Sequence, residues 1–474
     1  MDNAIGHFID TFVREMAEDN VALFAGAGLS VVSGTVDWKA LIAPLAAQLG
    51  LDVDKEHDLV SLAQYHYNEH QRHALNQRLI TEFSRGHAKN ENHEILARLP
   101  IRTFWTTNYD RLIETALTEA GRIPDVKYTV KHFVLTRPKR DAIVYKMHGD
   151  MENPDDAVLI KDDYERYFRD RGSFVNALSG DLVSKTFLFL GLSFTDPNLD
   201  YILSRVRINF SDSQRQHYYI TKRREHLPGE SEDVFRYASL QQEFAIKDLK
   251  RFNIQTLLVD RYDEVTAILR TIESRYRQRT VLISGSAHEY GDFPNPWDFM
   301  QGLSRALIQN EYKIVSGFGL GVGSDVITGA LQQIYQTQGQ SLHDQLILRP
   351  FPQGEDAQKQ WESYRQDMVA HAGIAIFIFG NKLGPDGSGV LPATGVRREF
   401  EIARARNLQL IPIGATGFIA AELWQEVMND FDGYYPGSTA DFKQLFASLG
   451  DSSRSGADHI SAIIKLLSHI KRNH

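Results

Sequence analysis

Val21-Ala-Leu-Phe-Ala-Gly-Ala-Gly-Leu-Ser30 is the stretch that decides how the first half of this chain folds. Its first five residues are a continuous apolar run of strand length, and Gly26-Ala-Gly28 breaks the run just before a stretch with helical character. A strand followed by such a turn and a helix often cradles a phosphate group, because glycines let the backbone approach a pyrophosphate closely. Taken alone, the pattern is also typical of a structural turn.

Two later segments repeat this arrangement of a strand followed by a polar residue. Residues 103–107 are β-branched and aromatic, and Asn108 follows them where a helix over 110–120 opens. Residues 142–147 form another apolar run, and His148 follows it ahead of a glycine. Open parallel sheets bind ligands at such strand ends. Taken singly, Asn108 is also typical of a helix N-cap and His148 of a hydrogen-bonded loop residue.

The three segments occur together and in this order, and the combination resembles the sirtuin family over about residues 1–275. The resemblance implies a Rossmann-like domain in which the Gly-Ala-Gly turn holds the NAD phosphates. It further implies that the Asn and the following Asp line the nicotinamide and ribose site, and that the His is a general base. Carried onto this chain, it assigns Gly26, Ala27, Gly28, Ser30, Asp37, Asn108, Asp110 and His148.

The chain also departs from the sirtuin pattern in ways that bear on the reaction. Sirtuin deacylases carry Gly-Ile-Pro-Asp-Phe-Arg after the first motif, where residues 34–39 here keep Asp37 but end in Lys39. Sirtuins also use a four-cysteine zinc module to frame the acyl-lysine groove, and this chain has no cysteine. A thiolate zinc site is therefore impossible. Water, rather than an acyl oxygen, becomes the expected acceptor of the ADP-ribosyl group.

Cleavage of NAD at the nicotinamide bond needs few catalytic groups, because the positively charged nicotinamide ring leaves as a neutral molecule. The transition state resembles an oxocarbenium ion. Positioning and electrostatics carry most of such a reaction. We expect Asn108 to hold the ribose and order the attacking water, and His148 to accept a proton. Ser193 and Asp196 follow the apolar strand Thr186–Leu190 and are expected to contact the dinucleotide. A helix cap and turn is the alternative for them.

Composition indicates a multidomain protein of 474 residues with 42% hydrophobic content and a formal charge of −9. The acidic balance argues against a general nucleic-acid surface. The absence of a charged-then-apolar leader, and of any apolar run near membrane-span length, favours a cytoplasmic protein without a membrane segment. A helical insertion is expected over residues 58–99, and we expect no metal at its histidines, whose spacing mixes helix faces: His66, His70, His73, His87 and His93.

A second domain begins after the charged connector 273–279. Thr280–Ser286 reads as a strand ending in small residues, and a strand from Lys313 ends in four glycines within 317–323. Such a density of glycine offers backbone amides to phosphate oxygens, with a structural glycine loop as the alternative. Further strands at Leu346–Leu348, Ile374–Phe379 and 408–413 alternate with helices at 357–370 and 396–405, which predicts a second Rossmann-like parallel sheet.

This second half resembles the SLOG group, which includes the LOG phosphoribohydrolases and the lysine-decarboxylase-like proteins. LOG enzymes pair an Arg with a Glu that follows a Pro-Gly-Gly-x-Gly-Thr loop. Here Arg365 and Glu399 match the pair, but the Pro-Gly-Gly loop is missing. The resemblance therefore favours binding of a nucleotide without turnover, and hydrolysis of a nucleotide is the rival interpretation.

A sirtuin-like domain followed by a SLOG domain resembles the ThsA effectors of Thoeris anti-phage defence over nearly the whole chain. That resemblance implies an α/β fold with an NAD hydrolase domain at 1–275 and a SLOG sensor domain at 280–474. It implies a homotetramer, a cyclic ADP-ribose isomer made by a TIR-domain partner as the activating signal, and depletion of NAD in abortive infection. The matching signal-site positions are Gly285, Ser286, Gly317, Gly319, Arg365, Lys382 and Glu399. Two alternatives stay open: a nucleotide-sensing scaffold without catalysis, and a deacylase or ADP-ribosyltransferase.

Overall fold

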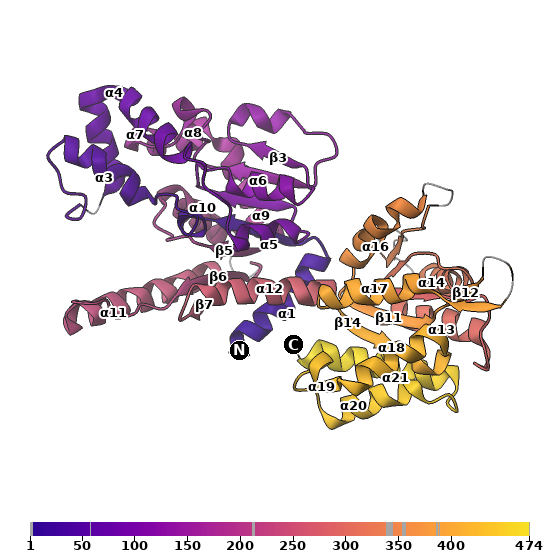
Figure 1. Cartoon of the computed structure of the whole chain (residues 1–474). Coiled ribbons are helices and arrows are strands. Elements are labelled where there is room, and N and C mark those ends of the chain that lie inside the picture. The colour runs from indigo at the N-terminus through magenta and orange to yellow at the C-terminus, as the bar shows by residue number, and fades with distance from the viewer. Residues whose placement is uncertain are drawn as a thin grey trace. The chain divides into compact units, whose positions relative to one another are not determined.

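The computed structural model describes residues 3–56, 58–210, 214–337, 345–352, 357–384, 387 and 389–473. The chain divides into two compact units, Met1–Glu273 and Ser274–His474. Figure 1 shows the first unit in indigo to pink and the second in orange to yellow. The division falls inside helix α12 (Asp263–Arg277), so the two units are joined by a continuous helix rather than by a loop.

The described part of the first unit holds a seven-stranded sheet in the order β3-β4-β2-β1-β5-β6-β7, and every neighbouring pair in it is parallel. The strand order reverses between β1 and β5, which is where open sheets of this kind bind ligands. The strands are β1 Val21–Ala25, β2 Thr103–Thr106, β3 Pro124–Lys127, β4 Ala142–Lys146, β5 Thr186–Leu190, β6 His217–Lys222 and β7 Ile254–Val259.

Helices cover both faces of this sheet, which explains why β1 and β5 are buried along their whole length. On one face Phe24 and Phe187 share a core with residues of α9 and α10, and on the other Leu23 and Phe104 meet α5 and α6. The helices are α1 Asn3–Ala17, α2 Ala27–Val31, α3 Trp38–Gln48, α4 Leu59–Phe83, α5 Glu91–Arg98, α6 Leu112–Glu119, α7 Lys161–Glu165, α8 Tyr167–Asp170, α9 Gly172–Ser184, α10 Pro197–Phe210 and α11 Glu232–Leu249.

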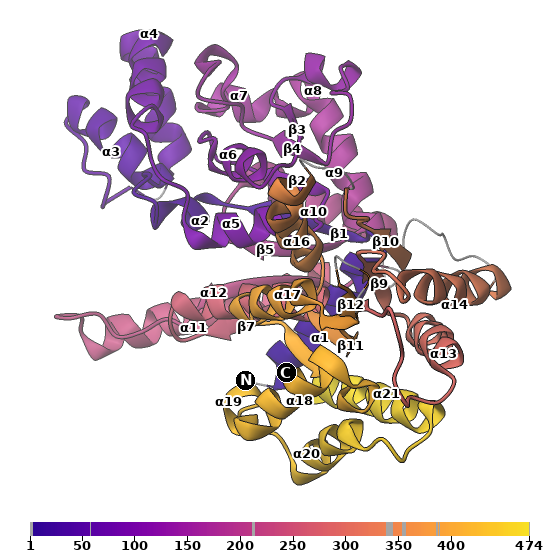
Figure 2. The same cartoon turned by 45° about the vertical axis from the view of Figure 1, so that its right-hand side comes forward.

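The predicted helical insertion is confirmed as α4 and α5. Helix α4 packs against α3, and the two lie side by side in Figures 1 and 2. The backbone of α4 is interrupted at Gln71, which has a φ of 61°. Helix α1 buries the apolar stripe that the sequence predicts, namely Ile5, Phe8, Ile9, Phe12, Val13 and Met16.

The second unit has a parallel sheet in the order β10-β9-β8-β11-β14 among its described residues, together with an antiparallel hairpin of β12 and β13. Its strands are β8 Thr280–Ser286, β9 Lys313–Ser316, β10 Leu346–Leu348, β11 Ile374–Phe379, β12 Asn381–Leu383, β13 Val390–Pro392 and β14 Gln409–Pro412. The strand order reverses between β8 and β11. The expected α/β class with two parallel sheets is confirmed.

Helices surround this second sheet as well. Helices α13 and α14 pack against each other, as Figure 2 shows, and α21 packs on α13. The helices are α13 Pro296–Gln309, α14 Gly323–Gln336, α16 Trp361–Ala370, α17 Thr394–Ala405, α18 Phe418–Asn429, α19 Phe431–Tyr434, α20 Ala440–Ala447 and α21 Gly456–Asn473. None of the helices in the described residues is both long enough and apolar enough to span a membrane.

Several elements differ from the sequence expectation. The helix expected over 110–120 begins only at Leu112, and the first turn of the helix expected over 357–370 is a 3-10 turn, Ala357–Gln360. The helix expected from 396 begins two residues earlier, at Thr394. The sequence did not predict β3, β6, the β12–β13 hairpin or the C-terminal helices from α18 onward. β3 and β12 are short and contain charged residues, so they lack an apolar run.

Candidate functional site

Four neighbouring strands of the first sheet bring the candidate residues to one edge. β4, β2, β1 and β5 are adjacent and parallel, so the loops that follow them lie beside one another. The segments after these strands carry the candidate residues: Gly26 and, in α2, Ala27, Gly28 and Ser30 after β1; Asn108 and Asp110 after β2; His148 after β4; and Ser193 and Asp196 after β5.

The Gly-Ala-Gly turn is crossed at close range by the turn that follows β5. The amide of Gly26 donates to the Leu190 carbonyl at 2.8 Å, and the amide of Gly28 donates to the Gly191 carbonyl at 2.9 Å. A Cβ at Gly28 would lie 2.9 Å from the Cα of Gly191, and one at Gly26 would collide with the Gly191 carbonyl. Since neither Gly26 nor Gly28 has a positive φ, close approach of backbone is the reason for both glycines. Their amides already have protein partners, and a phosphate contact of this turn remains a prediction.

Asn108 is not a helix cap, which settles the alternative that the sequence left open. Helix α6 has Arg111 at its N-cap, with no side-chain cap. The Nδ2 of Asn108 instead donates to the Gly26 carbonyl at 3.1 Å and to the Oγ of Ser30 at 3.2 Å. Its backbone amide donates to the Oγ1 of Thr106 at 2.9 Å. Asn108 is buried, and it ties the end of β2 to the turn after β1.

His148 is buried and meets a carboxylate from across the sheet. Its Nε2 lies 2.9 Å from the Oδ2 of Asp196, an ion-pair distance at which the ring N–H is not well aligned for a hydrogen bond. The rings of Tyr109, Tyr164 and Tyr167 surround the imidazole, with the ring of Tyr164 centred 5.5 Å away and nearly perpendicular. Because His148 follows β4 and Asp196 follows β5, their contact spans the ends of β2 and β1.

Asp196 is both a helix cap and the partner of His148. Its Oδ1 accepts the amide of Leu199 at 2.9 Å, in the first turn of α10. Burial favours the neutral acid, but His148 and the backbone amides of Leu199 and Asn198 outweigh it and hold the pKa of Asp196 below its usual value. The cap that the sequence offered as an alternative is therefore present, and the pairing with His148 is a contact the sequence did not predict.

The remaining predicted residues of this half have local partners. Asp110 is buried, and its Oδ1 accepts the amide of Leu112 at 3.0 Å, at the start of α6. The Oγ of the exposed Ser193 lies 2.8 Å from the Oγ1 of Thr195. Asp37 is exposed and caps α3 by accepting the amide of Ala40 at 2.8 Å. A contact of these three side chains with a dinucleotide stays a prediction.

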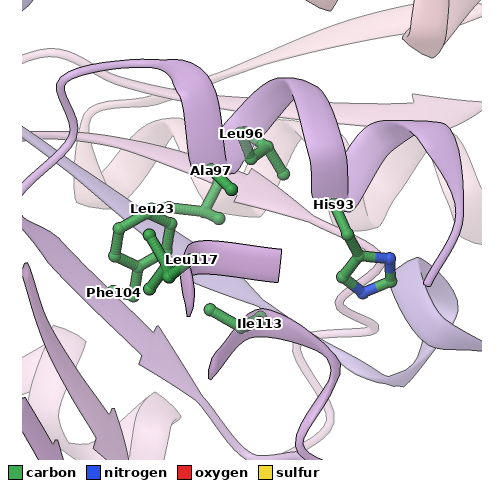
Figure 3. Close-up of a pocket in the computed structure, with 7 residues that line it drawn as sticks. All are labelled: Leu23, His93, Leu96, Ala97, Phe104, Ile113 and Leu117. Carbon is green, nitrogen blue, oxygen red and sulfur yellow. The ribbon is translucent and has the colours of Figure 1, made fainter. Parts of the chain in front are cut away.

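His66 and His93, two histidines of the insertion, have structural partners. The Nε2 of His66 lies 2.7 Å from the Oε1 of Gln48. His93 completes a capping box with Asn90 at the start of α5, and Figure 3 shows its imidazole beside a small apolar pocket of about 10 Å³ between α5, α6 and the sheet. In the described part of the chain, no group of three or more His, Cys, Asp or Glu side chains is arranged to hold a metal ion.

The second unit has a cavity of about 750 Å³ at the carboxyl ends of its central strands. All seven residues that the sequence assigns to a signal site line it: Gly285, Ser286, Gly317, Gly319, Arg365, Lys382 and Glu399. The end of β8, the loops after β9 and β10, and the helices α16 and α17 form its walls, beside the point where the strand order reverses. This is the place where an open parallel sheet binds its ligand.

Arg365 lies among the aromatic and acidic residues that line this cavity. Its guanidinium lies over the rings of Phe351 and Trp361, at 5.3 and 5.7 Å from their centroids. Its Nη2 would lie 2.9 Å from a Cβ at Gly395, so the absence of a side chain there makes room for it. Its Nε is buried without a hydrogen-bond partner, 3.6 Å from the Oε1 of Glu399. A stacked guanidinium with free donors suits a phosphate or another planar acceptor.

Glu399 is held from the other side by Ser284, whose hydroxyl donates to its Oε2 at 2.6 Å. Burial raises the pKa of Glu399 above its usual value, although Ser284 and Arg365 act in the opposite direction. Sequence reasoning missed Ser284, Phe351 and Trp361. Trp361 stands one helical turn ahead of Arg365, and that i, i+4 spacing is the one signal that could have pointed to it.

Comparisons with known proteins agree with the two-part organisation. The Sir2- and TIR-associating SLOG family matches residues 264–470, and the SIR2-like domain family matches residues 102–245. The chain is 52% identical to a protein of Bacillus cereus (strain MSX-D12) named NAD(+) hydrolase ThsA, over 98% of each chain. Proteins of the same name are 47% identical in Cytobacillus dafuensis, over 98% of this chain and 96% of the relative, and 46% identical in Acinetobacter baumannii (strain 532279), over 98% and 97%.

Proposed function

This chain belongs to the ThsA family of NAD(+) hydrolases, and on that premise we propose that it cleaves NAD(+) to nicotinamide and ADP-ribose. The observation that carries the proposal is the cluster at the edge of the first sheet. Asn108 is anchored to the turn after β1, and His148 is paired with a carboxylate from the loop after β5. These contacts place an amide and an imidazole at the strand-order reversal, where a dinucleotide binds in folds of this class.

Each of these residues has a role in hydrolysis that its contacts support. Asn108 donates both amide hydrogens to the protein, which leaves its Oδ1 to accept a hydrogen bond from a ribose hydroxyl or from the attacking water. His148 accepts the proton of that water or hydroxyl. The carboxylate of Asp196 stabilises the imidazolium that results. The surrounding tyrosine rings limit access of bulk water to the site.

We propose that the second unit binds a cyclic ADP-ribose isomer as an activating signal. Its cavity of about 750 Å³ falls within the ~300–1,000 Å³ typical of small-molecule sites. Arg365 and Lys382 supply positive charge for a pyrophosphate, the rings of Phe351 and Trp361 supply flat apolar surface, and Glu399 accepts from a ribose hydroxyl. Without the Pro-Gly-Gly loop, binding without turnover is the interpretation we favour for this cavity.

The biological role we propose is NAD depletion in anti-phage abortive infection, started when a TIR-domain partner makes the signal. We propose a cytoplasmic homotetramer with an NAD hydrolase domain over 1–275 and a sensor domain over 280–474. Helix α11 supports self-association, because Leu249 is its only buried residue and Val234, Tyr237, Leu240 and Phe244 are exposed along it.

The decisive experiment is chromatographic quantification of nicotinamide and ADP-ribose released from NAD, with and without a panel of cyclic ADP-ribose isomers. We expect signal-dependent release by the wild type, and a loss of at least ~10²-fold in the Asn108→Ala and His148→Ala variants. His226→Ala, at an exposed histidine, is the matched control and should behave as wild type.

The products separate the alternatives. Free ADP-ribose supports hydrolysis, acyl-ADP-ribose would indicate a deacylase, and transfer of ADP-ribose to protein would indicate a transferase. NAD binding without nicotinamide release under every condition would make the chain a nucleotide-sensing scaffold and overturn the proposal.

A further inference from the structure

Lys146, two residues before His148, carries a charge into the interior of the first unit. Its side chain is completely buried, at 0% exposure. Burying an ammonium group is costly unless its donors are satisfied and an opposite charge lies close by. The groups that surround this amine therefore indicate the role of the lysine.

Four oxygen atoms surround the amine, and they come from two loops and one helix. Its Nζ donates to the carbonyls of Tyr109 and Asp110, at 3.2 and 2.5 Å, and to the Oδ2 of Asp150 at 2.5 Å. The Oε1 of Glu114, on α6, lies 3.1 Å away. Tyr109 and Asp110 directly follow Asn108, and Asp150 lies two residues after His148.

The charges of this cluster favour an ionised lysine. Burial alone would lower the pKa of Lys146, but Glu114, Asp150 and Asp110 outweigh it and raise that pKa above its usual value. Burial raises the pKa of Glu114, and Lys146 opposes this rise. The side chain of Asp150 is 1% exposed, and its Oδ1 also accepts the amide of Glu152 at 2.9 Å. Lys146 is therefore a charged, fully coordinated group.

We propose that Lys146 is a positioning residue that fixes the loop of Asn108 and the loop of His148 relative to each other. The inference rests on the proposed hydrolysis, because those two loops carry its reacting side chains. The same loops are also joined by the amide of Met151, which donates to the Tyr109 carbonyl at 3.2 Å, and by an exposed ion pair of Arg111 with Glu152. The contacts of Lys146 differ from these because they are charged and fully buried. Lys146 itself is shielded from solvent, so it acts through Asn108 and His148 and not by touching NAD.

The chain supplies a matched control in Lys127, at the end of β3. Lys127 is also buried, at 3% exposure, and its Nζ lies 2.8 Å from the Oδ1 of Asp125. It also donates to the Leu135 carbonyl. None of these partners belongs to the loops that carry Asn108 or His148. Lys127→Met therefore removes a buried, paired ammonium without affecting the loops in question.

The test compares NAD hydrolysis by Lys146→Met, Lys127→Met and the double variant Lys146→Met/Asp150→Asn, with the cyclic ADP-ribose isomers present. For Lys146→Met we expect kcat to fall about 10²-fold, since a displacement of ~1 Å in a reacting group costs that much, with KM within about threefold of wild type. Both Lys146→Met and Lys127→Met should lower the melting temperature, but the kcat of Lys127→Met should stay within about twofold of wild type. The double variant removes the stranded carboxylate charge, so it should recover part of the melting temperature while kcat stays low.

Hydrogen–deuterium exchange of the same proteins tests the positioning directly. Exchange over residues 107–112 and 147–152 should rise in the double variant and remain at the wild-type level in Lys127→Met. A kcat near that of the wild type in either folded Lys146 variant would overturn the proposal, as would unchanged exchange in both loops. If the wild type itself releases no nicotinamide, the proposed function fails, and the exchange data alone then decide whether Lys146 joins the loops.

Discussion

At the scale of single residues, the proposed chemistry rests on side chains that each make two kinds of contact. Asp196 accepts a backbone amide of α10 with one oxygen and meets His148 with the other. Because this hydrogen bond ties the carboxylate to the first turn of α10, the helix fixes the group that meets the imidazole. Asn108 is fixed in the same way, by the Gly26 carbonyl and the Ser30 hydroxyl. Both side chains proposed to react are thus oriented by the protein itself.

The buried His93 leads to a prediction of how the stability of the protein depends on pH. Burial beside the apolar pocket of Figure 3 lowers the pKa of His93 to about 4, with Asp110 acting in the opposite direction. An unfolded histidine has a pKa of about 6.5, so between pH 6.5 and 4 the unfolded state binds more protons. The free energy of unfolding should therefore fall as the pH drops through this window, by roughly 2 kcal/mol for His93 between pH 7 and 5.

Urea unfolding of wild type and His93→Gln at pH 7 and pH 5 measures this contribution. The difference between the two pH values should be smaller in His93→Gln, whose side chain does not titrate. The pKa of His217 is also lowered to about 4 by burial, so part of the pH dependence should remain. The variant His226→Gln, at an exposed site, should keep the full wild-type dependence. Equal pH dependence in wild type and His93→Gln would contradict the argument.

At the scale of elements, the crossing of two turns holds the first site together. Gly191, between β5 and α10, has a φ of 64°, and a Cβ there would collide with the amide nitrogen of Leu29. The turn after β1 therefore lies directly against the turn after β5. Since α2 and α10 start from these two turns, their packing fixes where Ser30 and Asp196 stand.

Gly191→Ala should therefore be strongly destabilising, by about 3 kcal/mol or more, because a positive φ and a backbone collision coincide. Gly180→Ala is the matched control within the adjacent α9: nothing lies within 4 Å of its added Cβ. There the substitution should stabilise the helix by roughly 0.5–1 kcal/mol. Thermal unfolding of both variants measures these two changes in stability. A small loss of stability in Gly191→Ala would show that the turns can move apart.

At the scale of the whole molecule, the proposed switch must connect a binding cavity in one unit to a reaction in the other. A ligand shifts such an equilibrium only by the difference between its affinities for the two states. An NAD hydrolase that was always active would harm its own cell. The resting state must therefore dominate without signal, and the signal must bind the active state more tightly.

Arg365→Ala should abolish activation while leaving the fold and the oligomeric state unchanged, because it removes only the stacked guanidinium from the cavity of the second unit. Nicotinamide release with the cyclic isomers present should remain at the unstimulated level. Light scattering should give the wild-type mass. Arg406→Ala, at an exposed arginine that hydrogen-bonds to Gln366, is the control and should respond normally. A normal response of Arg365→Ala would remove this residue from the signal site.

The sequence by itself determined the strands and the loops on which the candidate residues stand. β1, β5, β8, β10 and β11 have the expected bounds, because parallel strands covered on both faces are continuous apolar runs that end at glycine or polar residues. The polar edge strand β3, Pro124–Lys127, has no such run, and neither has the hairpin of β12 and β13. Local pattern therefore identifies strands that form a continuous apolar run, whether central like β1 or at an edge like β10, and misses strands without such a run.

Only the tertiary structure decided which of these residues meet. His148 and Asp196 are far apart in the chain, and no spacing rule joins them; the strand order β4-β2-β1-β5 does. The same order brings Asn108 to the Gly26 carbonyl and so removes the helix-cap alternative. The amine of Lys146 finds its four oxygens in the same way. Periodicity reports which residues are buried, whereas partners across a sheet follow from its strand order, which is a property of the whole fold.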